Sequence, residues 1–339
     1  MPLSNGRIKL TDIARLTGHT VGTVSKALHD KPGLSPKTRE RILRIARENG
    51  YIGNALAGSL RSGTTRTAAI ILGDIANPLF AIIAKGLIAA LARVGYSAIL
   101  LNSDENGAEE ERAVVTALSR NVDGVLLCPT QRDTQSVSLL RRNDTPCVLV
   151  CRHFEGDTSL DSAVFDDLRG GRLAAEHLLA LGHRDVLFLA GPECVSSARE
   201  RRQGFFEVMR AAGVQPDPAL VREVPITADA SDNIARILSE ERHYTAVCAF
   251  SDYVAWQALY ALNERGVRVP QDVSVVGFDD IHSDIRLPIP LTTVGCDKRG
   301  LCERAVELLM RRIAEPDAPA MHACMETALI TRGTTRARD

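Results

Sequence analysis

Seven short apolar runs, separated by amphipathic segments, constrain the fold of this 339-residue chain more than any other feature. Each run has about five residues rich in Val, Ile and Leu, and they read TAAIILGD, SAILLN, GVLLC, CVLVC, DVLFLAG, AVCAF and VSVVGF. Such runs are typical of parallel strands buried on both faces. Amphipathic helices are expected between them at residues 80–94, 107–120, 168–181 and 255–265. The alternation predicts α/β structure of the doubly wound type.

The charge is divided unevenly along the chain. Residues 1–66 carry 12 Lys and Arg against 4 Asp and Glu, a net charge of +8, whereas the other 273 residues carry 29 against 38, a net charge of −9. A basic segment attached to a mildly acidic body predicts a module that binds a polyanion. The alternative is a cation-rich surface that contacts only solvent.

The first fifty residues have the spacing of three short helices. Gly18 separates the first two helical patterns, and Thr11 with Asp12, Thr20 and Ser35 are suited to cap the three helices. A second helix entered through a tight glycine-containing turn predicts a helix-turn-helix unit, whose second helix enters the major groove of DNA.

Short polar side chains dominate the surface that this unit would present to DNA. Thr and Ser hydroxyls and His29 suit phosphate oxygens, whereas base-edge contacts specify sequence. Val21 can contact the methyl group of a thymine, whereas Gly22 has no side chain to contact a base. Lys26 can donate to a guanine edge, but it lacks the two parallel N–H donors of an arginine. The residues of this unit expected at the DNA are Thr11, Thr20, Val21, Gly22, Ser25, Lys26 and His29.

The stretches LTDIARLTGHTVGTVSKALHD and GLSPKTRERILRIARENGYIGNALAGSL resemble the DNA-binding headpiece and hinge of the lac repressor (LacI/GalR) family. The resemblance implies a homodimer on double-stranded, pseudo-palindromic operator DNA. It also implies a hinge that coils only on the operator, with Asn54 and Ala57 at the DNA and Leu60 wedged into the minor groove. The alternative is that Leu60 packs against the body. Gly58 stands where the family often has an arginine, which removes a phosphate contact.

Later stretches, including EHLLALGHRDVLFLAGP, ARERRQGF and VPQDVSVVGFDDI, resemble the periplasmic-binding-protein-like core of the same family. The resemblance implies an all-α headpiece and a core of two doubly wound parallel-sheet lobes, with a small effector in the cleft between them. The expected divisions are a headpiece at 1–53, a hinge and linker at 54–66, an effector-binding and dimerisation core at 67–339, a first lobe at 67–163 and 295–323, and a second lobe at 164–294 and 324–335. Three crossovers are then expected near residues 163, 294 and 323.

The expected effector residues lie at strand ends or helix starts, and they are Asp74, Asn77, Phe80, Arg152, Arg201, Asp252 and Asp279. Arg201 matches the family's ligand arginine, and its donors suit a hydroxyl pair or a carboxylate. The alternative for Arg201 is a surface ion pair with Glu200 or Glu207, and Asp279 could instead cap the next segment. Cys151 replaces an acid that many relatives have before the Arg152 position. The expected effector is therefore a sugar or an anionic metabolite.

Other function classes are disfavoured. Eight scattered cysteines without a CxxC pair predict reduced thiols and no metal site. The chain has no dinucleotide or P-loop motif at a strand end, so no cofactor is expected. The histidines show no grouping with a nucleophile, which argues against an enzyme and catalytic residues. The chain has no signal-peptide pattern and no apolar run of about 18 residues, which favours a cytoplasmic, nucleoid-associated regulator with no membrane partner over a secreted solute-binding protein.

Overall fold

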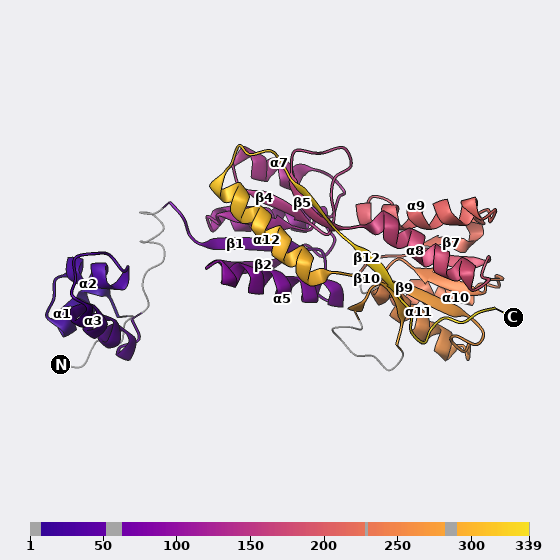
Figure 1. The fold of residues 1–339 in the computed structure, drawn as a ribbon, viewed down its shortest axis with the longest axis horizontal. Helices are drawn as coiled ribbons and strands as arrows, with labels where there is room; N and C mark the ends of the chain where they lie inside the picture. The colour runs from indigo at the N-terminus through magenta and orange to yellow at the C-terminus, as the bar shows by residue number, and fades with distance from the viewer. Residues whose placement is uncertain (1–7, 52–62, 228–229, 282–289, 339) are drawn as a thin grey trace. The chain divides into compact units, whose positions relative to one another are not determined.

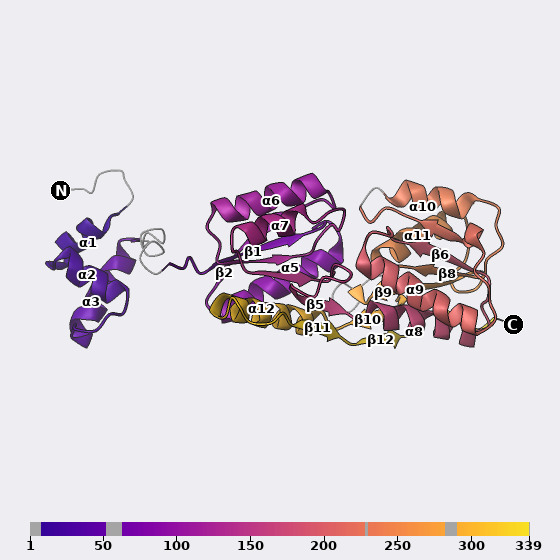
Figure 2. The same cartoon turned by 90° about the horizontal axis from the view of Figure 1, so that it is seen from above.

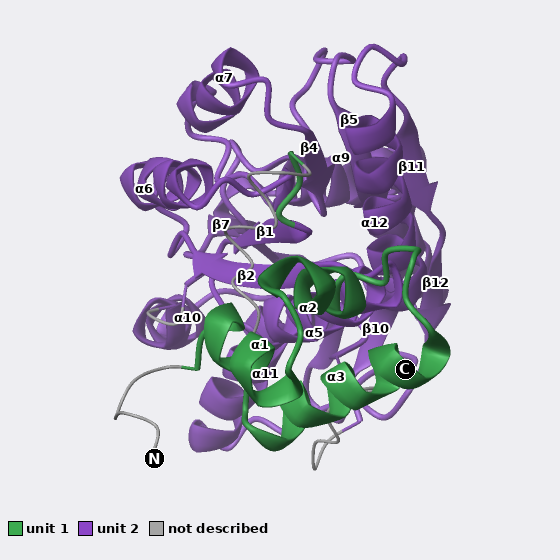
Figure 3. Ribbon diagram, turned by 90° about the vertical axis from the view of Figure 1, so that its left-hand side faces the viewer, with its two compact units in different colours: residues 1–65 green, residues 66–339 purple. Residues whose placement is uncertain are grey.

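The computed structural model describes residues 8–51, 63–227, 230–281 and 290–338. The chain divides into two units, residues 1–65 and 66–339, which Figure 3 colours green and purple. Among the described residues, every helix is too short or too polar to span a lipid bilayer.

The described part of unit 1 contains three helices, α1 (Leu10–Thr17), α2 (Val21–Leu28) and α3 (Pro36–Glu48) (Figure 1). Ile13, Val24 and Ile42, one from each helix, are completely buried. Three alanines complete the core, so it is small. Gly18 adopts a φ of +70° at the end of α1, where the left-handed region favours glycine, and the chain turns there into α2.

The helix caps follow the sequence at two of the three predicted positions. The side-chain oxygens of Thr20 and Ser35 each accept a hydrogen bond from a backbone N–H three residues further on, at 3.2 Å. The prediction for α1 was wrong in detail, because Thr11 lies inside the helix. Lys9 is the N-cap residue, and its N–H donates to the Asp12 carboxylate at 3.0 Å.

Unit 2 contains two six-stranded sheets. The first sheet has the order β11-β5-β4-β3-β1-β2 and is wholly parallel; its strands are β1 (Thr67–Leu72), β2 (Ser97–Asn102), β3 (Gly124–Leu127), β4 (Cys147–Val150), β5 (Asp161–Phe165) and β11 (His322–Met325). The second has the order β12-β10-β9-β8-β6-β7 and is parallel except for the β10–β12 pair; its strands are β6 (Val186–Ala190), β7 (Val221–Glu223), β8 (Ala246–Ala249), β9 (Ser274–Asp279), β10 (Thr292–Cys296) and β12 (Thr327–Ile330).

Helices cover both faces of each sheet, so each sheet forms the centre of a lobe (Figure 2). In the first lobe, α5 (Pro78–Arg93) and α12 (Lys298–Ala314) lie on one face, and α6 (Gly107–Ser119) and α7 (Gln135–Arg142) lie on the other. In the second lobe, α8 (Asp167–Ala180) and α9 (Ser196–Ala211) lie opposite α10 (Ala230–Ser239) and α11 (Asp252–Glu264), and the short 3-10 helix η1 (Pro218–Leu220) precedes β7. This arrangement confirms the predicted fold class.

The sides of β1 illustrate why the central strands are apolar throughout. Ile70 and Leu72 pack in the core beneath α5 and α12, whereas Ala69 and Ile71 pack in the core beneath α6 and α7. A strand covered by helices on both faces needs apolar side chains at every position. β2 differs from this expectation, because it lies at the sheet edge and its side chains are half-buried or exposed.

The chain crosses between the lobes three times, after β5, after β10 and after β11, at Asp166, Asp297 and Glu326. Each crossing lies three residues beyond the position expected from the sequence, because β5 and β10 continue to the residue before an aspartate. Asp166 and Asp297 then cap α8 and α12, accepting hydrogen bonds from backbone N–H groups at 2.9 and 2.8 Å.

We expect Ile42→Ala to unfold unit 1 and leave the lobes folded. Truncating a buried isoleucine costs about 2–5 kcal/mol, a large share of the ~5–15 kcal/mol that stabilises a domain. Limited proteolysis of the intact chain should show cleavage within residues 10–48 that is at least about 30-fold faster, the change that about 2 kcal/mol produces, with residues 66–339 still resistant. Leu16→Ala, at a position that is 43% exposed in the same unit, is the control and should cleave at the wild-type rate. Equal acceleration in both variants would contradict the prediction.

Candidate functional site

The outer side of α2 carries most of the residues expected at DNA. Val24 and Ala27 pack in the core of unit 1. The opposite side of the helix is exposed at Val21, Gly22, Lys26 and His29, with Ser25 half-buried beside them. Thr11 and Thr20 are also exposed. Asn54, Ala57 and Leu60, predicted to contact the minor groove, lie outside the described residues.

Local hydrogen bonds orient the polar groups of this surface. The Thr20 oxygen accepts from the Thr23 N–H at 3.2 Å, and the Thr20 and Thr23 hydroxyl oxygens lie 3.0 Å apart, so the two hydroxyls also share a hydrogen bond. His29 Nδ1 lies 2.9 Å from the Ser25 carbonyl oxygen. Arg39 of α3 donates to the Lys31 carbonyl oxygen at 2.6 Å and so holds the turn that follows α2. The outer side of α2 therefore presents short polar side chains and one lysine, and hydrogen bonds hold the ends of the helix.

The second candidate site is a cavity between the two lobes. Its walls follow the carboxyl ends of strands from both sheets, which is where ligands bind in open α/β sheets. Its space, including the part open to solvent, is about 490 Å³. The lining residues from the first lobe are Asn77, Leu79, Phe80, Glu105, Cys151, Arg152 and Phe165, and those from the second are Val195, Ser197, Arg201, Ile226, Phe250, Ser251 and Asp279.

The structure brings five of the seven expected effector residues together in this lining, namely Asn77, Phe80, Arg152, Arg201 and Asp279. Asp74 does not line the cavity, and its carboxylate accepts from the Ala76 N–H at 2.8 Å within its own turn. Asp252 is completely buried behind the wall, where it accepts from Thr293 Oγ1 at 2.5 Å and from the Ile281 N–H at 2.8 Å. Both carboxylates are thus occupied in holding loops.

Arg201 is buried and lies at the centre of the second-lobe wall. Its Nε donates to Asp167 Oδ1 at 2.7 Å, and Nη1 donates to the Phe250 carbonyl oxygen at 2.6 Å. Nη2 lies 3.3 Å from Asp279 Oδ1, and the guanidinium carbon lies 3.6 Å from the centroid of the Phe278 ring. The alternative of a surface ion pair with Glu200 or Glu207 is therefore wrong for Arg201.

Two glycines place Arg201 beside Asp167. A Cβ at Gly171 of α8 would collide with the Arg201 carbonyl oxygen, and a Cβ at Gly204 of α9 would collide with the Leu168 carbonyl oxygen. The two helices therefore pack backbone against backbone. This close approach explains the glycines in the segments DLRGGR and ERRQGF.

Asp279 presents an unsatisfied carboxylate at the cavity. It is completely buried, and neither side-chain oxygen has a hydrogen-bond partner of good geometry. Burial raises the pKa of Asp279 to about 6, against the charges of Arg201 and Lys298. The backbone is strained, with a φ of +109°, and Lys298 Nζ donates to the Asp279 carbonyl oxygen at 2.9 Å. A buried carboxylate that destabilises the fold and lies in a strained backbone conformation is typical of a ligand site.

The first-lobe wall holds a complete ion pair. Arg152 donates to both oxygens of Glu105 at 2.8 Å and also to the Pro129 carbonyl oxygen at 2.9 Å. Both side chains are nearly buried. Nη1 and Nη2 of Arg152 are therefore already hydrogen-bonded. An anionic effector, which the sequence left as one possibility, would find no unpaired guanidinium on this wall.

Sequence reasoning missed Glu105 and Ser251. Both follow the ends of strands, β2 and β8, so the rule that selected Asp74 and Arg152 also applies to them. Ser251 directly precedes Asp252, and the strand-end rule cannot distinguish the two neighbours.

Known proteins resemble this chain along nearly its whole length. Residues 9–54 match the model of bacterial regulatory proteins, lacI family, and residues 175–335 match a periplasmic binding protein-like domain. The HTH-type transcriptional repressor PurR of Pasteurella multocida (strain Pm70) is 30% identical over 97% of this chain and 99% of its own length.

Two solved structures share the fold. The complex of the transcriptional regulator CelR with cellobiose has a TM-score of 0.73 and 31% identity, covering 97% of this chain and 100% of that chain. The lac repressor dimer bound to operator and the anti-inducer ONPF has a TM-score of 0.84 and 27% identity, covering 98% of this chain and 100% of that chain.

We expect Asp279→Asn to stabilise the protein at pH 8. The folded-state pKa of about 6 exceeds the ordinary value of an aspartate, about 4, so the ionised carboxylate destabilises the fold. The destabilisation is absent below about pH 4 and complete above about pH 6. The variant's gain in the free energy of unfolding, about 2–3 kcal/mol at pH 8, should therefore vanish as the pH falls through that window. Denaturant unfolding at pH 8, 6 and 4 measures it.

Asp157→Asn is a control for which we expect the opposite change in the free energy of unfolding at pH 8. The pKa of Asp157 is lowered, because hydrogen bonds from Ser159 and the Arg141 charge outweigh burial. Its removal should therefore lower stability at pH 8, and the loss should fade in acid. A loss of stability at pH 8 in Asp279→Asn would contradict the prediction for Asp279.

Proposed function

Since the chain belongs to the lacI family of bacterial regulatory proteins, we propose that it represses transcription as a homodimer on a palindromic operator, under the control of a small neutral metabolite that binds between its lobes. The buried, unsatisfied Asp279 carboxylate beside Arg201 carries the effector part of this proposal. Its oxygens accept hydrogen bonds, and the guanidinium donates them, so the pair suits vicinal hydroxyl groups.

The charge and surface of unit 1 support DNA binding. Residues 1–66 carry a net charge of +8, and phosphate neutralisation supplies most of the nonspecific affinity for DNA. The exposed side of α2 would enter the major groove, with Lys26 as the side chain able to reach a guanine edge. Thr11, Thr20, Ser25 and His29 would hold the phosphates. Asn54, Ala57 and Leu60 of the proposed hinge (residues 54–66) would enter the minor groove.

Exposed aliphatic side chains support a dimer formed through residues 67–125. β2 lies at the edge of its sheet, with one side of its backbone unpaired within the described structure. The aliphatic side chains that are between 40% and 51% exposed in this region are Ile75, Ile88, Val94, Leu100 and Val115. An apolar surface next to an open sheet edge is a common site of association. Two-fold symmetry of the dimer would match a palindromic operator.

The cavity supports a neutral effector with several hydroxyl groups. Glu105 pairs with Arg152, whereas Asp167 and Asp279 share Arg201. The contact of Asp279 is long, at 3.3 Å, so its carboxylate can still accept from a ligand. An added carboxylate or phosphate would meet that acceptor at a cost of like-charge repulsion. The structure of a similar regulator with cellobiose is consistent with a neutral sugar. Effector binding would change the closure of the lobes and, through the linker, the folding of the hinge, with a coupling free energy of about 1–3 kcal/mol.

We expect Leu60→Ala to lower affinity for the specific operator by about tenfold and to leave nonspecific affinity unchanged. An inserted leucine stabilises a kinked duplex, whereas phosphate contacts dominate nonspecific binding. Footprinting on genomic fragments would first locate the operator, and titrations of operator and scrambled duplex at one salt concentration would then compare the variants. Lys37→Ala, at an exposed position early in α3, is the control, because the loss of a positive charge should weaken binding to both duplexes alike. Equal losses on both duplexes would rule out the insertion.

We expect Asp279→Asn to weaken sugar binding by about 10–100-fold, because a hydrogen bond to a charged group contributes about 1.5–3 kcal/mol. Calorimetry with neutral mono- and disaccharides, and with their phosphorylated counterparts, should detect binding of a neutral sugar only. Operator affinity of the variant without sugar should equal that of the wild type. Binding restricted to phosphorylated sugars would overturn the neutral-effector proposal.

A further inference from the structure

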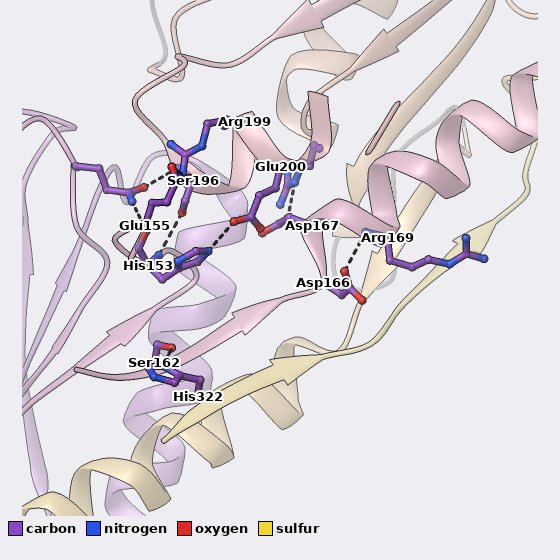
Figure 4. Close-up of polar contacts among 12 residues, drawn as sticks. His153, Glu155, Ser162, Asp166, Asp167, Arg169, Ser196, Arg199, Glu200 and His322 are labelled. Carbon is purple, nitrogen blue, oxygen red and sulfur yellow. Dashed lines mark hydrogen bonds and ion pairs between the residues drawn. The ribbon is translucent and has the colours of Figure 1, made fainter. Parts of the chain in front are cut away.

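The rim of the cavity carries a set of hydrogen bonds between the two lobes. Arg152 and Ser197 line the cavity, and their neighbours His153 and Ser196 face each other across the cleft (Figure 4). The His153 N–H donates to Ser196 Oγ at 3.2 Å. His153 follows β4 in the first lobe, and Ser196 begins α9 in the second. The contact therefore lies directly beside the ligand space.

Gln131 closes a ring of hydrogen bonds at this point. The Ser196 N–H donates to Gln131 Oε1 at 2.8 Å, and Gln131 Nε2 donates to the His153 carbonyl oxygen at 2.5 Å. The first N–H groups of a helix have no partner within the helix. The first lobe thus supplies the acceptor that the start of α9 requires, and separating the lobes would break this bond.

An ionisable pair lies across the same rim. His153 Nε2 is 2.6 Å from Glu200 Oε1, and both side chains are partly exposed. The hydrogen bond that His153 donates to the Glu200 carboxylate raises the pKa of His153, against burial and the charge of Arg199. A second pair, Glu155 and Arg199, crosses the cleft at 3.3 Å.

We propose that Gln131, His153, Ser196 and Glu200 form a proton-dependent latch that holds the lobes closed at the mouth of the cavity. The latch is a property of the lobes themselves. Its regulatory meaning rests on the function proposed above, because a closed cavity retains an effector.

The direction of the pH effect follows from linkage. When the lobes separate, His153 loses Glu200 and its pKa returns toward the ordinary value of about 6.5. Closure then takes up a proton from solvent. The stabilisation of the closed state is complete below about pH 6.5 and is lost as the pH rises through the raised pKa of His153. Acidification from about pH 8 to about pH 6 should favour closed lobes.

Other ionisable groups face the latch and must be separated from it. Burial raises the pKa of Asp167, which lies near Glu200, to about 7, and burial raises the pKa of Cys324, also near Glu200, to about 11. Asp167 titrates in the same range, so the pH dependence of the wild type alone does not identify His153. Glu200→Gln keeps an acceptor for the imidazole without a charge, and His153→Gln keeps a donor without titration in this range.

Hydrogen exchange of the full chain, with neither ligand nor DNA, tests the latch. After correction for intrinsic rates, the opening of amides in residues 196–199 should increase from pH 6 to pH 8, because closure of the lobes binds a proton. Both Glu200→Gln and His153→Gln should reduce this dependence by several fold. Glu207→Gln, which lies on the same helix and loses a pairing with Arg172 within the second lobe, should behave as the wild type.

Histidine-labelled NMR gives a second measurement. The resonance missing from His153→Gln should titrate above pH 6.5 in the wild type and shift to lower pH in Glu200→Gln. A pH-independent opening in the wild type, or an unchanged dependence in Glu200→Gln, would overturn the latch. Neither result depends on DNA or sugar, so failure of the latch is distinguishable from failure of the proposed function.

Discussion

The buried guanidinium of Arg201 is the group on which the geometry of the cavity depends. It joins α9 to Asp167 at the start of α8, to the Phe250 carbonyl oxygen after β8 and to Asp279 at the end of β9. Breaking a buried ion pair leaves an uncompensated charge, which costs far more than the complete pair contributes to stability. Three strand and helix ends are therefore held at one point, and the position of the ligand-facing carboxylate follows from them. Gly171 and Gly204 are the sequence features that permit this convergence.

The charged groups around the cavity pair with one another so that the Asp279 carboxylate remains able to accept a hydrogen bond from a ligand. Glu105 and Arg152 satisfy each other on the first-lobe wall, and Asp167 satisfies Arg201 on the second. Among the described cavity-lining residues, Asp279 is the carboxylate whose oxygens make no hydrogen bond of good geometry, since its contact with Arg201 Nη2 is 3.3 Å long. Its burial is unfavourable without a ligand, so a ligand that donates to it recovers stability that the empty protein lacks. The proposed selectivity for hydroxyl groups over anions rests on the same imbalance.

The sequence predicted the elements whose signals are local and the site residues that follow them. Short apolar runs located the central strands. The rule of strand ends and helix starts, together with the family resemblance at Arg201, located five cavity residues. The three-residue strand β7 (Val221–Glu223) has no such signal, because its pairing with β6 depends on the tertiary fold. At the start of α11, the choice between Ser251 and Asp252 depends on helix phase, and Asp252 turns inward to Thr293. Glu105 was missed because its partner, Arg152, is 47 residues away and their contact exists only once the sheet has formed.

The crossovers connect these local interactions to the behaviour of the whole lobe. Asp166 and Asp297 end a strand and cap the following helix within one residue, so any rotation of the lobes must be absorbed by a few dihedral angles at element ends. Such a rotation would move each lobe as a unit, and β1, the first described strand after unit 1, belongs to the first lobe. If the proposed effector and the proposed latch act on the same closure, their free energies add in one equilibrium. On the same proposal, a proton bound at the partly exposed pair of His153 and Glu200 would shift the closure equilibrium on which the effector acts, and so would alter the response to the effector.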